Sequence, residues 1–534
     1  MSTVKYHEVE LNKLPKKELI RLFLLQQADM NNKFDLLLEQ LQVMKQGKFG
    51  SSSEKSTIEG QMTLEDMTGC FNEAEHTADG NIAEPLLEQI IPEHRRKIKP
   101  KGKRDADLSI FPTRTEEHTL SEEKLCELFD GSYRRLPDDV YKKLEFYPAT
   151  FEVVEHRIAV YCGNKNQQII RADRPAEIMK NSVVTPSLLA GILNYKYVNS
   201  QPINRLAEEF KRNDAVISKQ TMCNWVIRGT ERYLSLLYER MHQKLGSCMI
   251  VHADESPLRV TRDGRDTKSK SYMWVYKSGT EADQPQMTLF DYQKTRHADH
   301  PKKFLQDFKG ILISDGYRPY QMIGEERPDE ITVAGCWSHA RRHFVNATKA
   351  LGKTKAKGTL AEAALSHISA IYHKDNSLSK LNLKERLKQR QLYVKPLVEA
   401  YFTWIKSVKD EVQTKSETGK GFTYCINQER YLKVFLNHPE LPLDNNAAER
   451  AHRTFCVGKK NWYVTSTVEG AQASAIAYSI AETAKANHLK PYEYYKYLLE
   501  EIPKHVDKGS KLDFLDDLLP WSSNLPEKVK KTIK

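Results

Sequence analysis

Short apolar runs bounded by polar turns characterise the chain between residues 249 and 351. Runs of this length predict buried strands, whereas apolar residues spaced three and four apart predict helices. We expect three antiparallel strands joined by short connections at residues 249–254, 272–276 and 287–292. Helices and strands then alternate, with helices at 297–308, 317–323 and 339–351 and strands at 310–315 and 331–337.

Three further patterns precede this region. Residues 15–45 are predicted to be helical, and their apolar residues follow a coiled-coil seam that Gln27 interrupts, namely Phe23, Met30, Phe34, Leu37, Leu41 and Met44. The seam fits a self-associating helix, or equally an amphipathic helix packed on its own chain. Residues 47–107 are polar and end in a basic run at 94–104, which fits a solvated tether or a flexible segment that tracks phosphates.

Alternating apolar residues at 151–161 predict a β-hairpin within a small module at 108–180. Farther along, residues 202–212 predict a helix, 213–217 a connector, and Ser218 the N-cap of a second helix that ends near Arg228. This is the spacing of a helix-turn-helix, in which the start of the second helix reaches base edges. The residues placed there are Ser218, Lys219, Gln220 and Asn224. Two short helices joined by a turn are also common in any α-rich protein.

Two acids stand at the carboxyl ends of predicted strands, where open α/β sheets bind their ligands. Asp254 ends the first strand and Asp315 ends the fourth. If these strands are neighbours, the two carboxylates can share a hard cation, which prefers oxygen ligands. The alternative is ordinary turn chemistry, because Asp315-Gly316 is a good turn dipeptide.

A third acid, Glu449, follows a helix-start pattern at residues 443–451. Asp444 or an adjacent asparagine can cap this helix, so that Glu449 lies about one turn inside it. In the alternative, Asn445 and Asn446 serve only as caps, and the segment is a well-made helix start that carries a solvated acid.

Composition narrows the class of protein. A length of 534 residues predicts three or more modules, and 40% hydrophobic with 29% charged residues is typical of soluble globular proteins. Lys plus Arg number 82 against 71 Asp plus Glu, a net charge of +11 that favours, weakly, a polyanionic partner. Neither a signal peptide nor an apolar run of about 18 residues is present, so we expect a cytoplasmic protein without a membrane segment. The eight cysteines contain no C-x-x-C pair, and we interpret them as reduced thiols.

Several strings occur together in one order. They are Asp254-Glu255-Ser256-Pro257, Ser314-Asp315-Gly316-Tyr317, Gly335-Cys336-Trp337-Ser338-His339-Ala340-Arg341-Arg342, Leu443-Asp444-Asn445-Asn446-Ala447-Ala448-Glu449-Arg450 and Gly458-Lys459-Lys460-Asn461-Trp462. The chain thereby resembles transposases of the insertion sequence sixty-six family, from the N-terminal helix to residues 517–521. The resemblance implies that Asp254, Asp315 and Glu449 are catalytic acids on a ribonuclease H-like core, whose element order matches the one predicted above.

The resemblance also implies an activity. Three carboxylates can hold two Mg²⁺ or Mn²⁺ ions for metal-dependent cleavage and joining of DNA. The implied partners are the transposon ends and target DNA, together with a second copy of the chain. Two other hypotheses are a nuclease of the same fold that never joins DNA, and a non-catalytic DNA-binding protein. The family commonly has a cysteine-paired zinc module, but only Cys126 and Cys162 fall in that region here, so no zinc is expected.

Residues around the acids are candidates for DNA contacts. Arg450 and Arg453 follow Glu449 on its helix and would meet phosphates, or would only form surface salt bridges. Lys459 and Lys460 add charge, and Trp462 would stack on a splayed base or belong to the core. His339, Arg341 and Arg342 follow the strand ending at Trp337, and His339 would approach the scissile phosphate or only fix the helix start.

The predicted fold class is therefore multidomain α+β, with a ribonuclease H-like α/β core that carries a helical insertion. An N-terminal helix, a small β module and a helix-turn-helix precede this core. The expected divisions are 1–46 for the helix, 47–107 for the linker, 108–180 for the β module, 181–245 for the helix-turn-helix, 246–344 for the first part of the core, 345–440 for the insertion, 441–490 for the core helix with the third acid, and 491–534 for a C-terminal tail.

Overall fold

The structure, a computed structural model, describes residues 113–531 except 131, 148–149, 166, 267, 281–282 and 507–511, together with 15–21, 23–24, 26–27 and 30. The chain divides into two compact units. One comprises Met1–Lys99, Ala340–Ser377 and Tyr393–Asn427, and the other Pro100–His339, Leu378–Leu392 and Gln428–Lys534. Each unit is described by itself.

A five-stranded mixed sheet forms the centre of the second unit, in the order β10-β9-β5-β7-β8. The strands β5 (Ile250–Leu258), β7 (Ser271–Ser278) and β8 (Thr288–Gln293) form an antiparallel meander, as predicted. The strands β9 (Gly310–Ile313) and β10 (Ile331–Ala334) run parallel to β5. Helices α10 (Asp299–Phe304) and α11 (Arg318–Glu326) connect them, also as predicted. The predicted fourth and fifth strands are shorter than expected, because the chain turns before Asp315 and helix α12 already begins at Trp337.

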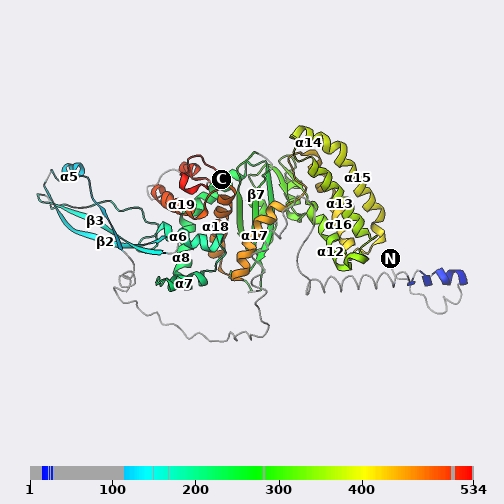
Figure 1. Ribbon diagram of the computed structural model, residues 1–534, viewed down its shortest axis with the longest axis horizontal. Helices are drawn as coiled ribbons and strands as arrows, with labels where there is room; N and C mark the ends of the chain where they lie inside the picture. Colours follow the sequence, from blue (N-terminus) through cyan, green and yellow to red (C-terminus); the bar gives the residue numbers. More distant parts are fainter. Residues whose placement is uncertain are drawn as a thin grey trace, which may run out of the picture. The chain divides into compact units, whose positions relative to one another are not determined.

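Helices α17 (Asn446–Trp462) and α18 (Val468–Ala486) lie beside this sheet (Figure 1). The Ser479 hydroxyl accepts a hydrogen bond from the Phe290 amide at 2.7 Å, and the Thr483 hydroxyl accepts one from the Thr288 amide at 3.0 Å. Both amides belong to the edge strand β8. Helix α18 therefore satisfies backbone donors that an edge strand would otherwise leave unpaired.

The residues expected as a C-terminal tail are folded. They form α19 (Pro491–Val506), α20 (Leu515–Leu518) and two 3₁₀ turns, η6 (Leu512–Phe514) and η7 (Glu527–Val529). Leu498, Leu499 and Ile502 are fully buried in the main hydrophobic core. Apolar residues at this spacing place one face of α19 against the helices α6 (Pro186–Leu193) and α18, so this segment is structural.

The β module is a second sheet, in the order β1-β3-β2, with β4 also paired to β3. Its strands are β1 (Thr113–His118), β2 (Tyr133–Tyr147), β3 (Thr150–Gly163) and β4 (Ile169–Arg171). The predicted hairpin is confirmed as β3 and β4, but β3 pairs over a greater length with the preceding strand β2. Helix α5 (Glu122–Phe129) packs Leu125 and Phe129 into a small core beside Ile158.

The predicted helix pair is present as α7 (Ile203–Arg212) and α8 (Lys219–Gly229), after α6 (Pro186–Leu193) and η1 (Asn194–Val198). The Ser218 hydroxyl caps α8 by accepting from the Thr221 amide at 3.1 Å. The predicted end near Arg228 is confirmed to within one residue, because α8 ends at Gly229. A π-helical turn, η2 (Thr230–Leu234), leads directly into α9 (Ser235–Leu245), because Tyr233 and Leu234 are buried and keep the chain helical.

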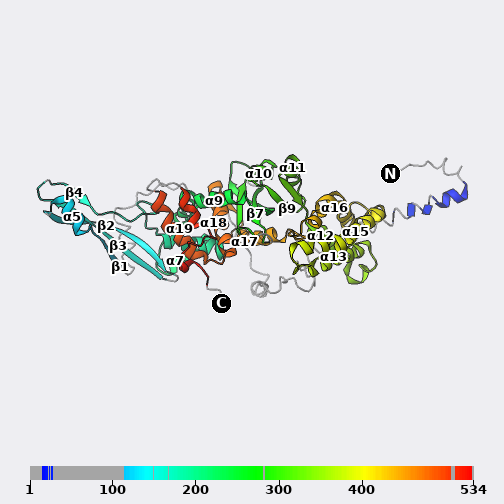
Figure 2. The same ribbon diagram turned by 90° about the horizontal axis from the view of Figure 1, so that it is seen from above.

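Residues 345–440 are helical, as predicted, but they do not all belong to one unit. The helices α12 (Trp337–Lys355), α13 (Leu360–Ser377), α15 (Lys395–Val408) and α16 (Glu417–Leu432) group together in Figure 2, and η4 (Lys409–Glu411) follows α15. Helix α14 (Leu383–Gln389), most of η3 (Arg390–Val394) and η5 (Val434–Asn437) belong to the unit that contains the central sheet.

Part of the predicted N-terminal helix is described, and Phe23 and Met30 are helical and exposed in it. The rest of the seam (Phe34, Leu37, Leu41 and Met44) and the basic run at 94–104 lie outside the described residues.

Candidate active site

Asp254 and Asp315 come together through the pairing of β5 with β9. The parallel register pairs His252 with Ile313, so each acid follows a paired residue by two positions, and the charge of Asp315 acts on Asp254. Asp315 also stabilises a turn, which was the alternative role predicted for it, because its Oδ1 accepts a hydrogen bond from the Tyr317 amide at 3.0 Å. Gly316 has a φ of 92°, which its lack of a side chain permits. One residue therefore both shapes the turn and places a carboxylate next to Asp254.

Glu449 reaches the same place from the first turn of α17. Burial is the largest cause of a pKa of Asp254 well above its usual range, and the charges of Glu255, Asp315 and Glu449 raise it further. The Asp254 side chain is 20% exposed. Carboxylates that oppose each other's ionisation in a partly buried site create a strong local demand for positive charge.

The donor set of these acids fits hard divalent cations, because it offers only carboxylate oxygens. Their ligand atoms do not converge on a single point. Among the described residues, three or more such groups lie within 4.8 Å of one another only in Cys336, His339 and Glu449, and in Glu116, His118 and His156. Pairs of carboxylates that share two ions, about 3.5–4 Å apart, do not require such convergence.

Asn445 anchors the start of α17 to the central strand. It is fully buried, and its Oδ1 accepts from His252 Nδ1 at 2.9 Å, while its Nδ2 donates to the Ala253 carbonyl at 2.8 Å. Its backbone amide donates to Cys336 Sγ at 3.2 Å. The alternative in which Asn445 serves only as a cap is wrong, because its side chain makes no capping bond. Asp444 takes that role, with Oδ1 accepting from the Asn446 amide at 3.1 Å, and burial raises the pKa of its carboxyl.

The loop that leads into α17 is held by a buried arginine. Arg390 is fully buried and donates to the carbonyls of Phe435, His438 and Leu441, each at 2.8 Å. Hydrogen bonds from a charged donor are among the stronger ones in proteins. The loop before the helix that carries Glu449 is therefore rigid, as a metal ligand requires.

Two histidines lie next to the acids. His339 Nδ1 is 3.6 Å from Glu449 Oε1, so this residue contacts a candidate ligand as well as standing in the first turns of α12. His452 Nε2 is 4.0 Å from Asp254 Oδ2. Burial lowers the pKa of His452 to about 4, so this ring is neutral at pH 7. Sequence reasoning missed His452, although its position three residues after Glu449 places both on one helix face.

Glu255 was also missed as a site residue. It follows Asp254 in β5, and alternation along a strand turns its side chain to the other face. There its Oε1 accepts from Arg296 Nε at 2.9 Å, and its Oε2 accepts from the Tyr320 hydroxyl at 3.2 Å. Burial and then Asp315 raise the pKa of Glu255, while Arg296 opposes the shift. The side chain is 2% exposed, so Glu255 acts through its charge and its packing.

The predicted base-reading residues of α8 are accessible. Ser218, Lys219, Gln220 and Asn224 are all exposed, and Gln220 Nε2 donates to Asn224 Oδ1 at 3.4 Å. A polar, exposed helix start of this kind is what major-groove recognition uses. The structure places this surface on elements other than those that carry the three acids.

The residues predicted to contact DNA near the acids differ in how far they are exposed. Arg450, Arg453 and Lys460 are exposed. Lys459 Nζ donates to the Pro257 carbonyl at 2.7 Å. Trp462 is partly buried and packs on the core, as its alternative supposed. Arg341 and Arg342 are partly buried residues of α12 in the helical unit.

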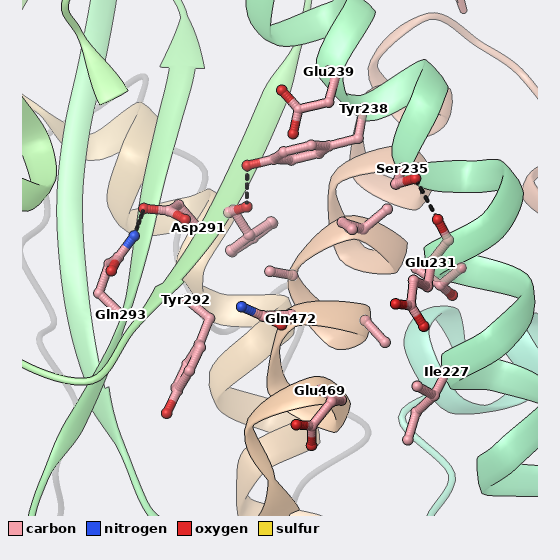
Figure 3. A pocket seen from close by; sticks show the side chains of 15 residues that line it. Ile227, Glu231, Ser235, Tyr238, Glu239, Asp291, Tyr292, Gln293, Glu469 and Gln472 are labelled. Atoms are coloured by element: carbon pink, nitrogen blue, oxygen red, sulfur yellow. Dashed lines mark hydrogen bonds between the residues drawn. The ribbon is translucent and has the colours of Figure 1, made fainter. Parts of the chain in front are cut away.

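A separate pocket lies between η2, α9, β8 and α18 (Figure 3). The carboxylates of Glu231, Glu239 and Glu469 surround it, and the Tyr238 hydroxyl donates to the Phe290 carbonyl at 2.9 Å. Burial raises the pKa of Asp291 to about 7. An acidic lining repels phosphate, so this pocket does not fit nucleic acid.

Among the described residues, no helix combines the length and apolar character that crossing a membrane requires.

Comparison with known proteins identifies relatives of the chain. A family model described as "Transposase IS66 family" matches residues 181–473, and one described as "IS66 C-terminal element" matches residues 479–521. Among curated proteins, "Uncharacterized protein y4jD" of Sinorhizobium fredii is 25% identical over 75% of this chain and 78% of its own length. "Uncharacterized protein y4hP" of the same organism is 26% identical over 74% of this chain and 73% of its own.

Proposed function

The chain belongs to the IS66 transposase family, and from this premise we propose that it cuts and joins DNA with Asp254, Asp315 and Glu449. In this proposal the central sheet is a ribonuclease H-like core that holds two Mg²⁺ or Mn²⁺ ions. The observation that carries the proposal is the gathering of the acids at Asp254, whose pKa is raised by burial and by the charges of Asp315 and Glu449.

The chemistry that divalent cations supply in such sites is activation of an attacking oxygen and stabilisation of a leaving oxygen during displacement at phosphorus. Water and then the freed 3′-hydroxyl are the successive nucleophiles, so no protein nucleophile is needed. The chain's own residues supply position. Asn445 holds the start of α17 against β5, and His339 borders Glu449 at 3.6 Å.

A neutral His452 favours cation binding at Asp254. Because its pKa is about 4, the ring carries no positive charge at pH 7 that would compete with a metal ion for the Asp254 carboxylate. Arg450 and Arg453 are exposed on α17 and carry charge suited to the phosphates on either side of the reacting one. The acids therefore bind cations while arginines on the same helix bind the DNA backbone.

In this proposal the start of α8 recognises the transposon ends, with Ser218, Lys219, Gln220 and Asn224 reaching base edges. Pairing of two ends requires two copies of the chain, and the N-terminal seam is the proposed pairing element. Deletion of residues 1–46 is expected to abolish paired-end complexes while single-end binding persists, as measured by light scattering and gel shift.

A strand-transfer assay tests the proposed function. Purified protein, labelled transposon-end DNA and plasmid target are incubated with Mg²⁺, with EDTA as the control. We expect both cleaved ends and joined products, and only with Mg²⁺. Cleavage without joining identifies a nuclease, and binding without either identifies a non-catalytic DNA-binding protein.

A further inference from the structure

A cluster of three metal-binding side chains lies on the β module, away from the acids of the central sheet. The parallel register of β1 with β3 pairs Glu116 with His156, and His118 stands two residues farther along β1, on the same face. His118 Nε2 and His156 Nδ1 are 3.1 Å apart, and Glu116 Oε2 is 3.8 Å from His156 Nδ1. One ligand atom from each residue lies within 4.8 Å of the other two.

The spacing of these atoms fits a first-row metal ion. Tetrahedral zinc with Zn–N bonds of about 2.0–2.1 Å separates its ligand atoms by about 3.3 Å. Facing ring nitrogens at 3.1 Å also leave no room for both to carry a proton, so at least one ring offers a lone pair. Two imidazoles and one carboxylate are a known zinc ligand set, with a fourth position open to water.

The residues around the cluster hold His156 in place and leave the cluster accessible to solvent. Tyr141 of β2 is paired with His156 and stacks on its ring, with centroids 5.0 Å apart. The His156 side chain is 14% exposed and Glu116 is 40% exposed, so an ion can enter from solvent. Arg114 is ion-paired with Glu116 Oε1 at 2.8 Å, and the other carboxylate oxygen, Oε2, faces His156. Lys143 is paired with Glu177, and Arg174 with Asp139.

We propose that Glu116, His118 and His156 form a binding site for one zinc ion, which clamps the edge strand β1 onto β3. The sequence expectation of no zinc rested on paired cysteines, and this site uses none. Cys126 is exposed on α5, and Cys162 is buried at the far end of β3 with its thiol donating to the Gly163 carbonyl. The site is independent of the chemistry proposed for the central sheet, so either assignment can fail alone.

Zinc titration of the full chain tests the proposal. Protein stripped with EDTA is titrated with ZnCl₂ by isothermal titration calorimetry, with Mg²⁺ present throughout. We expect one zinc per chain, and a loss of affinity in His118→Ala and in His156→Ala greater than the 10–100-fold that an outer partner contributes. His297→Ala is the matched control, because His297 is an exposed histidine whose Nδ1 lies 3.1 Å from the carboxylate of Asp299. This variant should bind zinc as the wild type does.

A ligand exchange keeps the test decisive if an alanine variant misfolds. His118→Cys retains a zinc ligand, and its Co²⁺ complex should gain a thiolate-to-metal absorption band that the wild-type complex lacks. Unchanged zinc affinity in both alanine variants overturns the proposal, as does folded wild-type protein that binds no zinc. Loss of the zinc in His339→Ala instead assigns the ion to the cluster with Cys336 and Glu449, and also overturns it.

Discussion

The central sheet and the β module each gather ligand atoms from segments far apart in the chain, but they hold them differently. Glu449 stands on a helix fixed by the fully buried Asn445 and by a loop that Arg390 ties down. Glu116 and His118 stand on the edge strand β1, whose sheet pairing is to β3 alone. The first set offers only oxygen to hard cations, and the second offers two ring nitrogens and one carboxylate oxygen to zinc. The two proposed sites therefore differ in two ways. The proposed reaction site has firmly anchored oxygen ligands, whereas the proposed zinc site has ligands on an edge strand that the ion itself would hold in place.

The largest effect expected is at the acids. Asp254→Ala and Asp315→Ala should each reduce cleavage and joining by about 10³-fold or more, because a bound metal supplies several kcal/mol of transition-state stabilisation and each 1.36 kcal/mol is tenfold. End binding in gel shifts should persist, since base reading is assigned to α8. Wild-type turnover in either variant would remove that residue from the site, and His118→Ala should leave turnover within a few-fold of wild type.

The support of Glu449 is tested by Asn445→Ala. The change removes the hydrogen bonds of the Asn445 side chain to His252 Nδ1 and to the Ala253 carbonyl, at a cost of about 1–3 kcal/mol for each lost bond to a buried polar group. A shift of about 1 Å in the helix start can cost about 10²-fold in rate. Single-turnover cleavage should therefore fall by about that factor, while Asn446→Ala, which keeps the backbone amide bonded to Asp444, should be much milder. Equal losses in the two variants would mean that the asparagine is not the anchor.

Base reading predicts a separate loss. Gln220→Ala and Asn224→Ala should each weaken binding to the transposon end by about 1–3 kcal/mol, roughly 5- to 150-fold, and relax sequence preference. Fluorescence anisotropy at fixed salt measures this. Glu208→Ala is a control on the neighbouring helix α7, where the residue is exposed outside the proposed contact surface. If neither variant changes affinity or preference, α7 and α8 are ordinary packing elements.

The smallest effect concerns stability. Because the native pKa of Asp254 is raised, the stabilising contribution of its protonated form is complete below about pH 4 and is lost as pH rises through the native pKa. At pH 7.5 without metal, Asp254→Asn should therefore raise Tm, by about 2–4 °C for each kcal/mol. Mg²⁺ should raise Tm of the wild type and not of this variant, as measured by calorimetry. A lower Tm in metal-free Asp254→Asn would show that the carboxylate stabilises the fold.

Much of the central sheet could be predicted, because buried strands leave short apolar runs in the sequence. The order of strands and helices around Asp254 and Asp315 followed from these runs alone. The helical continuation from α8 into α9 could not be predicted, because residues 230–234 stay helical through the burial of Tyr233 and Leu234 in the core.

The contacts of the candidate site were largely hidden. Nothing local distinguishes Asn445 as an anchor from Asn446 as a helix residue, since the difference depends on His252, 193 residues away. His118 and His156 are 38 residues apart and join only through strand register. By contrast, strand alternation alone predicts that Asp254 and Glu255 lie on opposite faces of β5, so the sequence did contain a signal for Glu255.

The most direct test of the central claim is joining of a precleaved transposon end to target DNA in Mg²⁺ by Glu449→Gln. This change keeps the size and helical preference of the side chain and removes its charge. Glu469→Gln is the matched control, because Glu469 is also an acid in the first helical turn, that of α18. The account predicts no joined product with Glu449→Gln and wild-type joining with Glu469→Gln. Joining by Glu449→Gln at the wild-type rate would contradict it.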